Sequence, residues 1–196
     1  MSKGFQGKLI VFSAPSGSGK TTIVRHLLAQ VRFNLEFSIS ATSRSPRANE
    51  KDGTDYYFIS VESFKKKIKN QEFLEWEEVY KNSFYGTLKS EVQRIWNKNK
   101  HIIFDVDVAG GLKIKNKFPH QTLSVFIKPP NVDELVKRLH KRGQDSKEKI
   151  AKRMAKAPVE FTKVLEFDKV IKNYNLQLAL QEAENTIDEF LASKPR

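Results

Sequence analysis

The 196-residue chain has no cysteine and no long apolar run. Without thiols, disulfide bonds and thiolate metal sites are excluded, and this residue usage is typical of a reducing compartment. No stretch approaches the ~20 consecutive apolar residues that a transmembrane helix needs. The N-terminal segment MSKGFQGKL also lacks the apolar region found in signal peptides. We therefore expect a cytoplasmic protein that has no membrane partner.

Signatures of nucleic-acid recognition are also missing, although the formal net charge is +12. A basic surface can bind nucleic acid through counterion release, or it can serve ligands that carry phosphate. The sequence contains no RNA-recognition, helix-turn-helix or zinc-finger pattern, and its lysines and arginines are spread over helical patterns. We interpret most of them as solvated helix faces and expect no specific nucleic-acid partner.

Short apolar runs alternate with amphipathic helical patterns along much of the chain. The runs lie at residues 8–13, 101–106, 122–127 and 169–172. The helical patterns lie at residues 21–31, 131–143 and 175–193. Continuous apolar strands separated by helices predict an α/β fold with a parallel sheet covered on both faces. In the last helical pattern, we expect a stripe of core residues made of Leu176, Leu178, Leu180, Ile187, Phe190 and Leu191.

Two segments interrupt this alternation. Residues 37–88 are rich in aromatic and β-branched residues, which predicts a small β-rich insertion with one helix near residues 61–70. Residues 131–158 are basic and helical, with Gly143 as a hinge or helix cap. We therefore divide the chain into these two excursions and a core of residues 1–36, 89–130 and 159–196.

The segment SAPSGSGKTT at residues 13–22 follows the first apolar run and opens a helix. It nearly matches the phosphate-binding pattern GxxxxGK[ST], except that Ala14 stands at the first glycine position. Gly17 and Gly19 allow a backbone whose successive N–H groups wrap phosphate oxygens. Lys20 supplies a cation for the β- and γ-phosphates, and the Thr21 hydroxyl is placed to ligate Mg²⁺. The predicted ATP-binding loop comprises Ala14, Pro15, Ser16, Gly17, Ser18, Gly19, Lys20, Thr21 and Thr22.

A loop of this kind occurs in ATPases, GTPases and kinases. The base-reading NKxD element of GTPases is absent, because NKNK at residues 97–100 is followed by His101, and no DxxG follows a strand. Instead, Asp105 and Asp107 stand two residues apart at the end of a predicted strand, which predicts that both side chains lie on one face of the sheet. A carboxylate there can organise Mg²⁺-bound water or contact a second ligand.

The predicted insertion carries Arg44 and Arg47 on either side of Pro46, followed by Tyr56 and Tyr57. Proline stiffens the segment and lowers the entropy lost when two guanidinium groups are aimed at one target. Arginine binds phosphate oxygens in pairs, and a tyrosine hydroxyl can add a further hydrogen bond. This combination predicts a receptor for a monophosphate group.

The pattern SxSxTSRSPRxxExDGxDYYF, followed by FLEW, FYGT and FDVDVAGG, resembles the guanylate kinase family. With the phosphate-binding loop, the resemblance extends from about residue 7 to residue 190. It implies a P-loop core with a five-stranded parallel sheet, a GMP-binding insertion at residues 37–88 and a helical lid at residues 131–158. It also implies transfer of the γ-phosphate of ATP to GMP, and to dGMP, with Mg²⁺ as cofactor. We expect a monomer or a homodimer.

The resemblance implies roles for single residues as well. The residues implied to hold the GMP phosphate are Arg44, Arg47, Tyr56 and Tyr85. The residues implied to lie on the guanine side are Ser40, Glu75, Thr87, Asp105 and Asp107. A carboxylate such as Glu75 can accept both N1–H and N2–H₂ of guanine, a donor pair that adenine lacks, so discrimination against AMP would follow.

The basic excursion supplies the remaining positive charge. Arg138 and Arg142 lie four residues apart on one helical face, and Arg153 follows in the next helical segment. The resemblance implies that these arginines close over ATP and act with Lys20 in catalysis, and that Asn173 contacts the nucleotide base. Closure would also exclude water from the reaction.

Three alternatives remain open at this point. The chain can be a guanylate-kinase-like interaction module that has lost catalysis, or a kinase of another nucleoside monophosphate. Its charge also allows nucleic-acid binding as a side activity.

Overall fold

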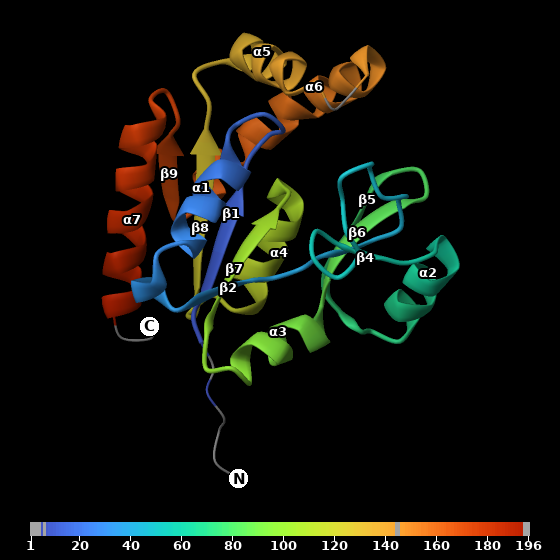
Figure 1. Ribbon diagram of the computed structural model, residues 1–196, viewed down its shortest axis with the longest axis horizontal. Helices are drawn as coiled ribbons and strands as arrows, with labels where there is room; N and C mark the ends of the chain where they lie inside the picture. Colours follow the sequence, from blue (N-terminus) through green and yellow to red (C-terminus); the bar gives the residue numbers. More distant parts are fainter. Residues whose placement is uncertain (1–4, 6, 144–145, 194–196) are drawn as a thin grey trace.

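A computed structural model describes Phe5 and residues 7–143 and 146–193 (Figure 1). Its larger sheet is five-stranded and parallel, in the order β2-β7-β1-β8-β9. The four strands predicted from apolar runs are confirmed; they are β1 (Leu9–Ser13), β7 (His101–Val106), β8 (Thr122–Lys128) and β9 (Lys169–Lys172). The fifth, β2 (Leu35–Phe37), is too short to give a periodic signal in the sequence.

Helices cover both faces of this sheet because alternate strand residues point to opposite sides. Ile10 and Phe12 of β1 pack into a cluster with α1 (Lys20–Leu28) and α7 (Leu176–Ala192). Leu9 and Val11 of the same strand pack with α3 (Lys89–Trp96) and α4 (Val108–Lys117). All four side chains are fully buried. The predicted α/β class with a parallel sheet flanked by helices is confirmed.

The predicted core stripe of α7 is wrong at two positions. Leu176 and Leu178 are 44% and 65% exposed. They lie in the first turn of the helix, outside the buried cluster. The buried face is made instead by Ala179, Ala183 and Ile187, with Leu180, Phe190 and Leu191 partly buried against the same cluster. Small alanines allow the helix to approach the sheet closely, and a search for large apolar residues does not find them.

The second sheet is formed within residues 41–88, in the order β4-β3-β6-β5. Its strands are β3 (Ala41–Thr42), β4 (Tyr57–Phe58), β5 (Phe73–Tyr80) and β6 (Ser83–Leu88), and α2 (Val61–Lys69) covers it. The Phe64 ring of α2 stacks on Phe73 with centroids 4.3 Å apart and on Phe84 at 5.3 Å. The predicted β-rich insertion with a helix near residues 61–70 is present, and it has its own small core.

Two helices lie over the end of the core sheet from which the phosphate-binding loop departs (Figure 1). They are α5 (Val132–Arg142) and α6 (Lys147–Thr162). Gly143 ends α5 in the left-handed conformation, with φ of 67°, as expected for a C-terminal cap. Short 3₁₀ turns, η1 (Val31–Phe33) and η2 (Val164–Glu166), complete the chain. Within the described ranges, no helix is both long and apolar enough to cross a membrane.

Candidate functional site

The loop between β1 and α1 has the backbone that its glycines predict. Gly17 and Gly19 adopt φ of +90° and +87°, which side chains disfavour. A Cβ on Gly19 would also lie 2.3 Å from Nδ2 of Asn173. Ala14 is buried and lies outside the left-handed region, so its methyl group fits where the common pattern has glycine. The loop conformation therefore does not depend on glycine at position 14.

Lys20 and Thr21 meet a carboxylate at the end of β7. Lys20 Nζ lies 2.8 Å from Oδ1 of Asp105 and donates to the Val106 carbonyl oxygen at 2.5 Å. Thr21 Oγ1 donates to Oδ2 of Asp105 at 2.7 Å. The structure thus places Asp105 at the phosphate-binding loop, with a hydroxyl and a carboxylate side by side.

Asp105 and Asp107 were expected on one face of the sheet, and of the two only Asp105 lies within a strand. Strand β7 ends at Val106, and Asp107 is the N-cap of α4, where its Oδ1 accepts from the Gly110 backbone N–H at 2.7 Å. Asp107 is itself extended, with φ of −69° and ψ of 174°, and the chain turns into α4 only after it. Asp105 therefore faces the loop, while Asp107 stands at the start of α4.

Three predicted residues beyond the loop contact it or surround it. Arg153 of α6 donates to Ser16 Oγ at 2.6 Å. Arg138 of α5 pairs with Glu134 at 2.9 Å and donates to the Asn173 carbonyl oxygen at 3.3 Å. The buried Asn173 amide donates to the Ser18 carbonyl oxygen at 2.7 Å, so in this structure it holds the loop. The fourth, Arg142, ends α5, and its side chain lies outside the described part of the structure.

The two arginines of the insertion share one carboxylate that the sequence analysis did not single out. Arg44 donates to both oxygens of Glu50, at 2.6 and 2.7 Å. Arg47 approaches the same group, since its backbone N–H donates to Glu50 at 2.8 Å and its Nη1 lies 3.7 Å from it. Glu50 follows Arg47 by three residues. That spacing alone does not identify it as a partner, because the contact forms only when the segment from Arg44 to Glu50 folds back on itself. The carboxylate orients both guanidinium groups.

The two tyrosines predicted with these arginines lie beside them. Arg44 Nε donates to the Tyr85 hydroxyl at 2.9 Å, and its guanidinium carbon lies 4.9 Å from the Tyr56 ring centroid. The tyrosine rings meet edge to face at 6.0 Å. Burial raises the pKa of Tyr56, and the Asp105 carboxylate of the core raises it further. The arginine–tyrosine cluster therefore lies near enough to Asp105, at the end of β7, for that charge to act on Tyr56.

Glu75 on β5 is a buried carboxyl next to a hydroxyl. Its side chain accepts from Thr87 Oγ1 on β6 at 2.8 Å, and both residues are almost fully buried. Burial raises the pKa of Glu75 to about 7, with a further contribution from Asp107 and an opposing one from Lys113. Ser40, also predicted on this side, is half-buried and gives its carbonyl oxygen to the Tyr57 N–H at 2.9 Å.

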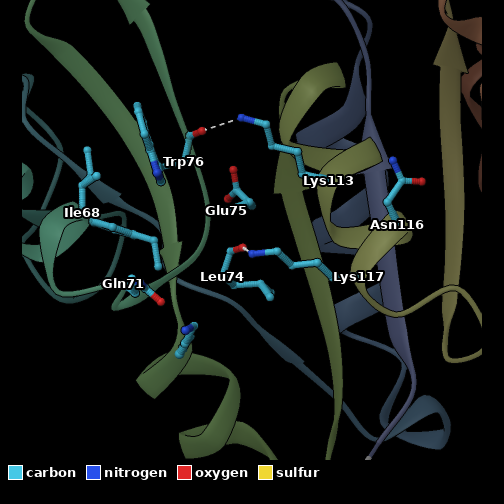
Figure 2. A pocket seen from close by; sticks show the side chains of 10 residues that line it. Ile68, Gln71, Leu74, Glu75, Trp76, Lys113, Asn116 and Lys117 are labelled. Atoms are coloured by element: carbon cyan, nitrogen blue, oxygen red, sulfur yellow. Dashed lines mark hydrogen bonds between the residues drawn. The ribbon is translucent and has the colours of Figure 1, made fainter.

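A pocket of about 560 Å³ opens where β5 faces α4 (Figure 2). Glu75 lies on its wall, together with Trp76, Lys113 and Lys117. The phosphate-binding loop and the arginine–tyrosine cluster do not line it. The pocket therefore lies between β5 and α4, apart from the phosphate-binding loop and the arginine–tyrosine cluster.

A second carboxyl with a raised pKa was missed by the sequence analysis. Glu160 of α6 has a pKa raised to about 7, first by burial and then by Asp107, while Lys20, Lys156 and Arg153 act in the opposite direction. It follows Arg153 by seven residues, two helical turns, and so lies on the same face of α6. That spacing was readable in the sequence once Arg153 had been chosen.

Comparisons with known proteins show which family this sequence and fold are similar to. The family model described as guanylate kinase matches residues 6–190. A guanylate kinase of Bacteroides fragilis is 52% identical over 186 residues, covering 95% of this chain and 91% of that protein. One of Porphyromonas gingivalis is 48% identical over 185 residues, covering 94% and 98%. The crystal structure of guanylate kinase from Anaplasma phagocytophilum has a TM-score of 0.79 at 27% identity and covers 98% of this chain and 90% of that one.

Proposed function

Because the chain belongs to the guanylate kinase family, we propose that its two facing sites carry ATP and GMP. The chain is a nucleoside monophosphate kinase that transfers a phosphoryl group to GMP. The observation that supports this most directly is that Asp105, which pairs with Lys20 at the end of β7, lies near enough to Tyr56 of the insertion for its charge to act on that ring. We propose the core, insertion and lid boundaries given above, with residues 131–158 closing over ATP.

The donor site is assigned to the loop and its neighbours. Backbone N–H groups of residues 16–22 surround the β- and γ-phosphates, and Lys20 exchanges its contact with Asp105 for phosphate oxygens. Arg138, Arg142 and Arg153 add positive charge from the lid, where developing charge on the transferred group needs neutralisation. Asn173 holds the loop from behind through Ser18 and lies close to the space for the nucleotide.

The donor set at Thr21 and Asp105 fits Mg²⁺. A hydroxyl and a carboxylate lie 2.7 Å apart, and Mg²⁺ prefers oxygen ligands completed by water and nucleotide phosphates. In the described ranges, no group of three or more His, Asp or Glu side chains is placed to hold a metal. The Thr21 hydroxyl and the Asp105 carboxylate are enough for Mg²⁺, because nucleotide phosphates and water supply its remaining ligands. When bound, Mg²⁺ would neutralise phosphate charge.

The acceptor site is assigned to the insertion. Arg44, Arg47, Tyr56 and Tyr85 bind the GMP phosphate, with Glu50 keeping the guanidinium groups in place. Glu75 accepts the two guanine donors, and the Thr87 hydroxyl beside it completes the base site with Ser40. Asp107 stands near Glu75 and raises its pKa, so it tunes the base-reading group. Asp105 lies between the two substrates, and its negative charge raises the pKa of Tyr56.

An acceptor panel tests the assignment. With ATP and Mg²⁺ as donor system, GMP and dGMP should be phosphorylated with kcat/KM at least ~10³-fold above AMP, because a buried carboxylate left unpaired by adenine is strongly disfavoured. Comparable values for AMP, CMP or UMP would contradict the base-site assignment. If the chain neither binds nucleotides nor turns them over, it would instead behave as an interaction module.

A further inference from the structure

Two lysines of α4 hold the strand that carries Glu75. Lys113 Nζ donates to the Trp76 carbonyl oxygen at 2.9 Å, and Lys117 Nζ donates to the Leu74 carbonyl oxygen (Figure 2). The two acceptors flank Glu75 on β5. Since β5 is the last strand of its sheet, these carbonyls have no partner strand on that side.

The spacing on the two elements matches. Residues four apart on a helix are separated by ~6 Å along the axis, because each residue rises 1.5 Å. Residues two apart on a strand are separated by ~6.7 Å. Lys113 and Lys117 can therefore reach Trp76 and Leu74 together without either side chain being displaced along the strand.

The first turn of α4 also comes up against Glu75. A Cβ on Gly110 would lie 2.8 Å from Glu75 Oε2 and 3.1 Å from Asp107 Oδ1. Strand β5 is thus close to the Asp107 carboxylate, whose negative charge repels that of Glu75. Lys113 opposes this repulsion as the nearby positive charge of the helix, and it also pairs with Glu77 at 2.6 Å.

We propose that Lys113 and Lys117 are positioning residues for guanine recognition, which hold β5 against α4 so that the Glu75 carboxylate is presented to the base. Neither lysine touches the substrate; both act through the strand. The inference rests on the proposed role of Glu75 and adds to it the connection between the insertion and the core.

Lys115 provides a matched control on the same helix. It also donates to a backbone carbonyl oxygen, that of Glu166 at 2.7 Å, and pairs with Asp168 at 2.9 Å, away from β5. Lys115→Met therefore removes a comparable contact without affecting the base-reading strand.

The test is a double-mutant cycle in the full chain. Lys113→Met/Lys117→Met should raise the KM for GMP by about tenfold, the usual effect of losing a hydrogen bond from a charged donor. The KM for ATP should stay within twofold, and Lys115→Met should change neither value. Lys113→Arg/Lys117→Arg should retain most of the GMP affinity, because guanidinium groups can also donate to the two carbonyls. In a Glu75→Gln background, the lysine substitutions should add nothing further.

The outcomes separate the two proposals. If Glu75→Gln raises the KM for GMP but the lysine substitutions leave it unchanged, or multiply it equally in both backgrounds, the positioning role is overturned and the base-reading role stands. IMP lacks the N2 amino group of GMP, so it tests the contact with Glu75. If Glu75→Gln leaves both the KM for GMP and the preference for GMP over IMP unchanged, the base-reading role and the positioning role are both overturned. The same cycle is run with the single variants Lys113→Met and Lys117→Met, each expected to raise the KM for GMP by about threefold. Their result does not depend on whether the double variant folds.

Discussion

Lys20 is the side chain on which phosphoryl transfer should depend most. It holds the only ammonium group of the loop, and its present partners are Asp105 and the Val106 carbonyl oxygen. Lys20→Ala should lower kcat by at least ~100-fold, the usual effect of removing one electrostatic donor to a transition state. Each side chain of the Lys20–Asp105 pair is only 15% exposed, so the variant should also lose some stability, and thermal unfolding should show that it remains folded at the assay temperature.

The matched control is Lys69→Ala, which removes an exposed lysine from α2, far from the loop. It should leave kcat and both KM values unchanged. Near-normal turnover in Lys20→Ala would contradict the assignment of the loop as the donor site.

Glu75 should make GMP binding depend on pH. Its pKa of about 7 means that the carboxylate needed to accept two guanine donors forms only as the pH rises through 7. The KM for GMP should therefore be about tenfold higher at pH 6 than at pH 8, following the ionised fraction. Glu75→Gln, which cannot titrate, should show only the change due to the GMP phosphate itself. An identical pH profile in both proteins would remove Glu75 from the base site.

Helix α6 contains Pro158, at an exposed position in its fourth turn. A proline there lacks the N–H that would bond to the Met154 carbonyl oxygen and crowds the preceding turn. Pro158→Ala should raise the free energy of unfolding by about 1–2 kcal/mol, after allowing for the more flexible unfolded chain. Denaturant unfolding would measure this, with the exposed neighbour Val159→Ala expected to change stability by under ~0.5 kcal/mol. A destabilised Pro158→Ala would mean that the packing of α6 needs the local bend.

Among the elements, strands and helices were predictable where a long periodic pattern existed. The four apolar runs became β1, β7, β8 and β9 because buried parallel strands are apolar on both faces. The short β2 and the two-residue β3 and β4 were not predictable as separate strands, since pairing with distant partners alone defines them. Leu176 and Leu178 show the opposite error: they were predicted in the core because they are apolar, but both are exposed.

For the whole molecule, the net charge of +12 should act on substrate capture, because both proposed substrates are anions. Raising the salt concentration from about 0.05 to 0.5 M shortens the Debye length several-fold and should lower kcat/KM for GMP by about tenfold, with a smaller change in kcat. Steady-state kinetics at matched Mg²⁺ would measure it. If kcat/KM were independent of salt, the charge would be serving some other purpose, and DNA binding with a steep salt dependence would be the first alternative to examine.

The local chemistry of this protein could be read from its residues alone. Gly17, Gly19, Lys20 and Thr21 form a phosphate-binding loop because backbone freedom and side-chain type act within a few residues of sequence. Distant relationships could not be read in this way. The shared Glu50 of Arg44 and Arg47 depends on how one short loop folds, and the effect of Lys20 on Glu160 arises when segments 140 residues apart pack together. Burial and neighbouring charge, which set the pKa of Glu75, exist only after β5 has docked on α4.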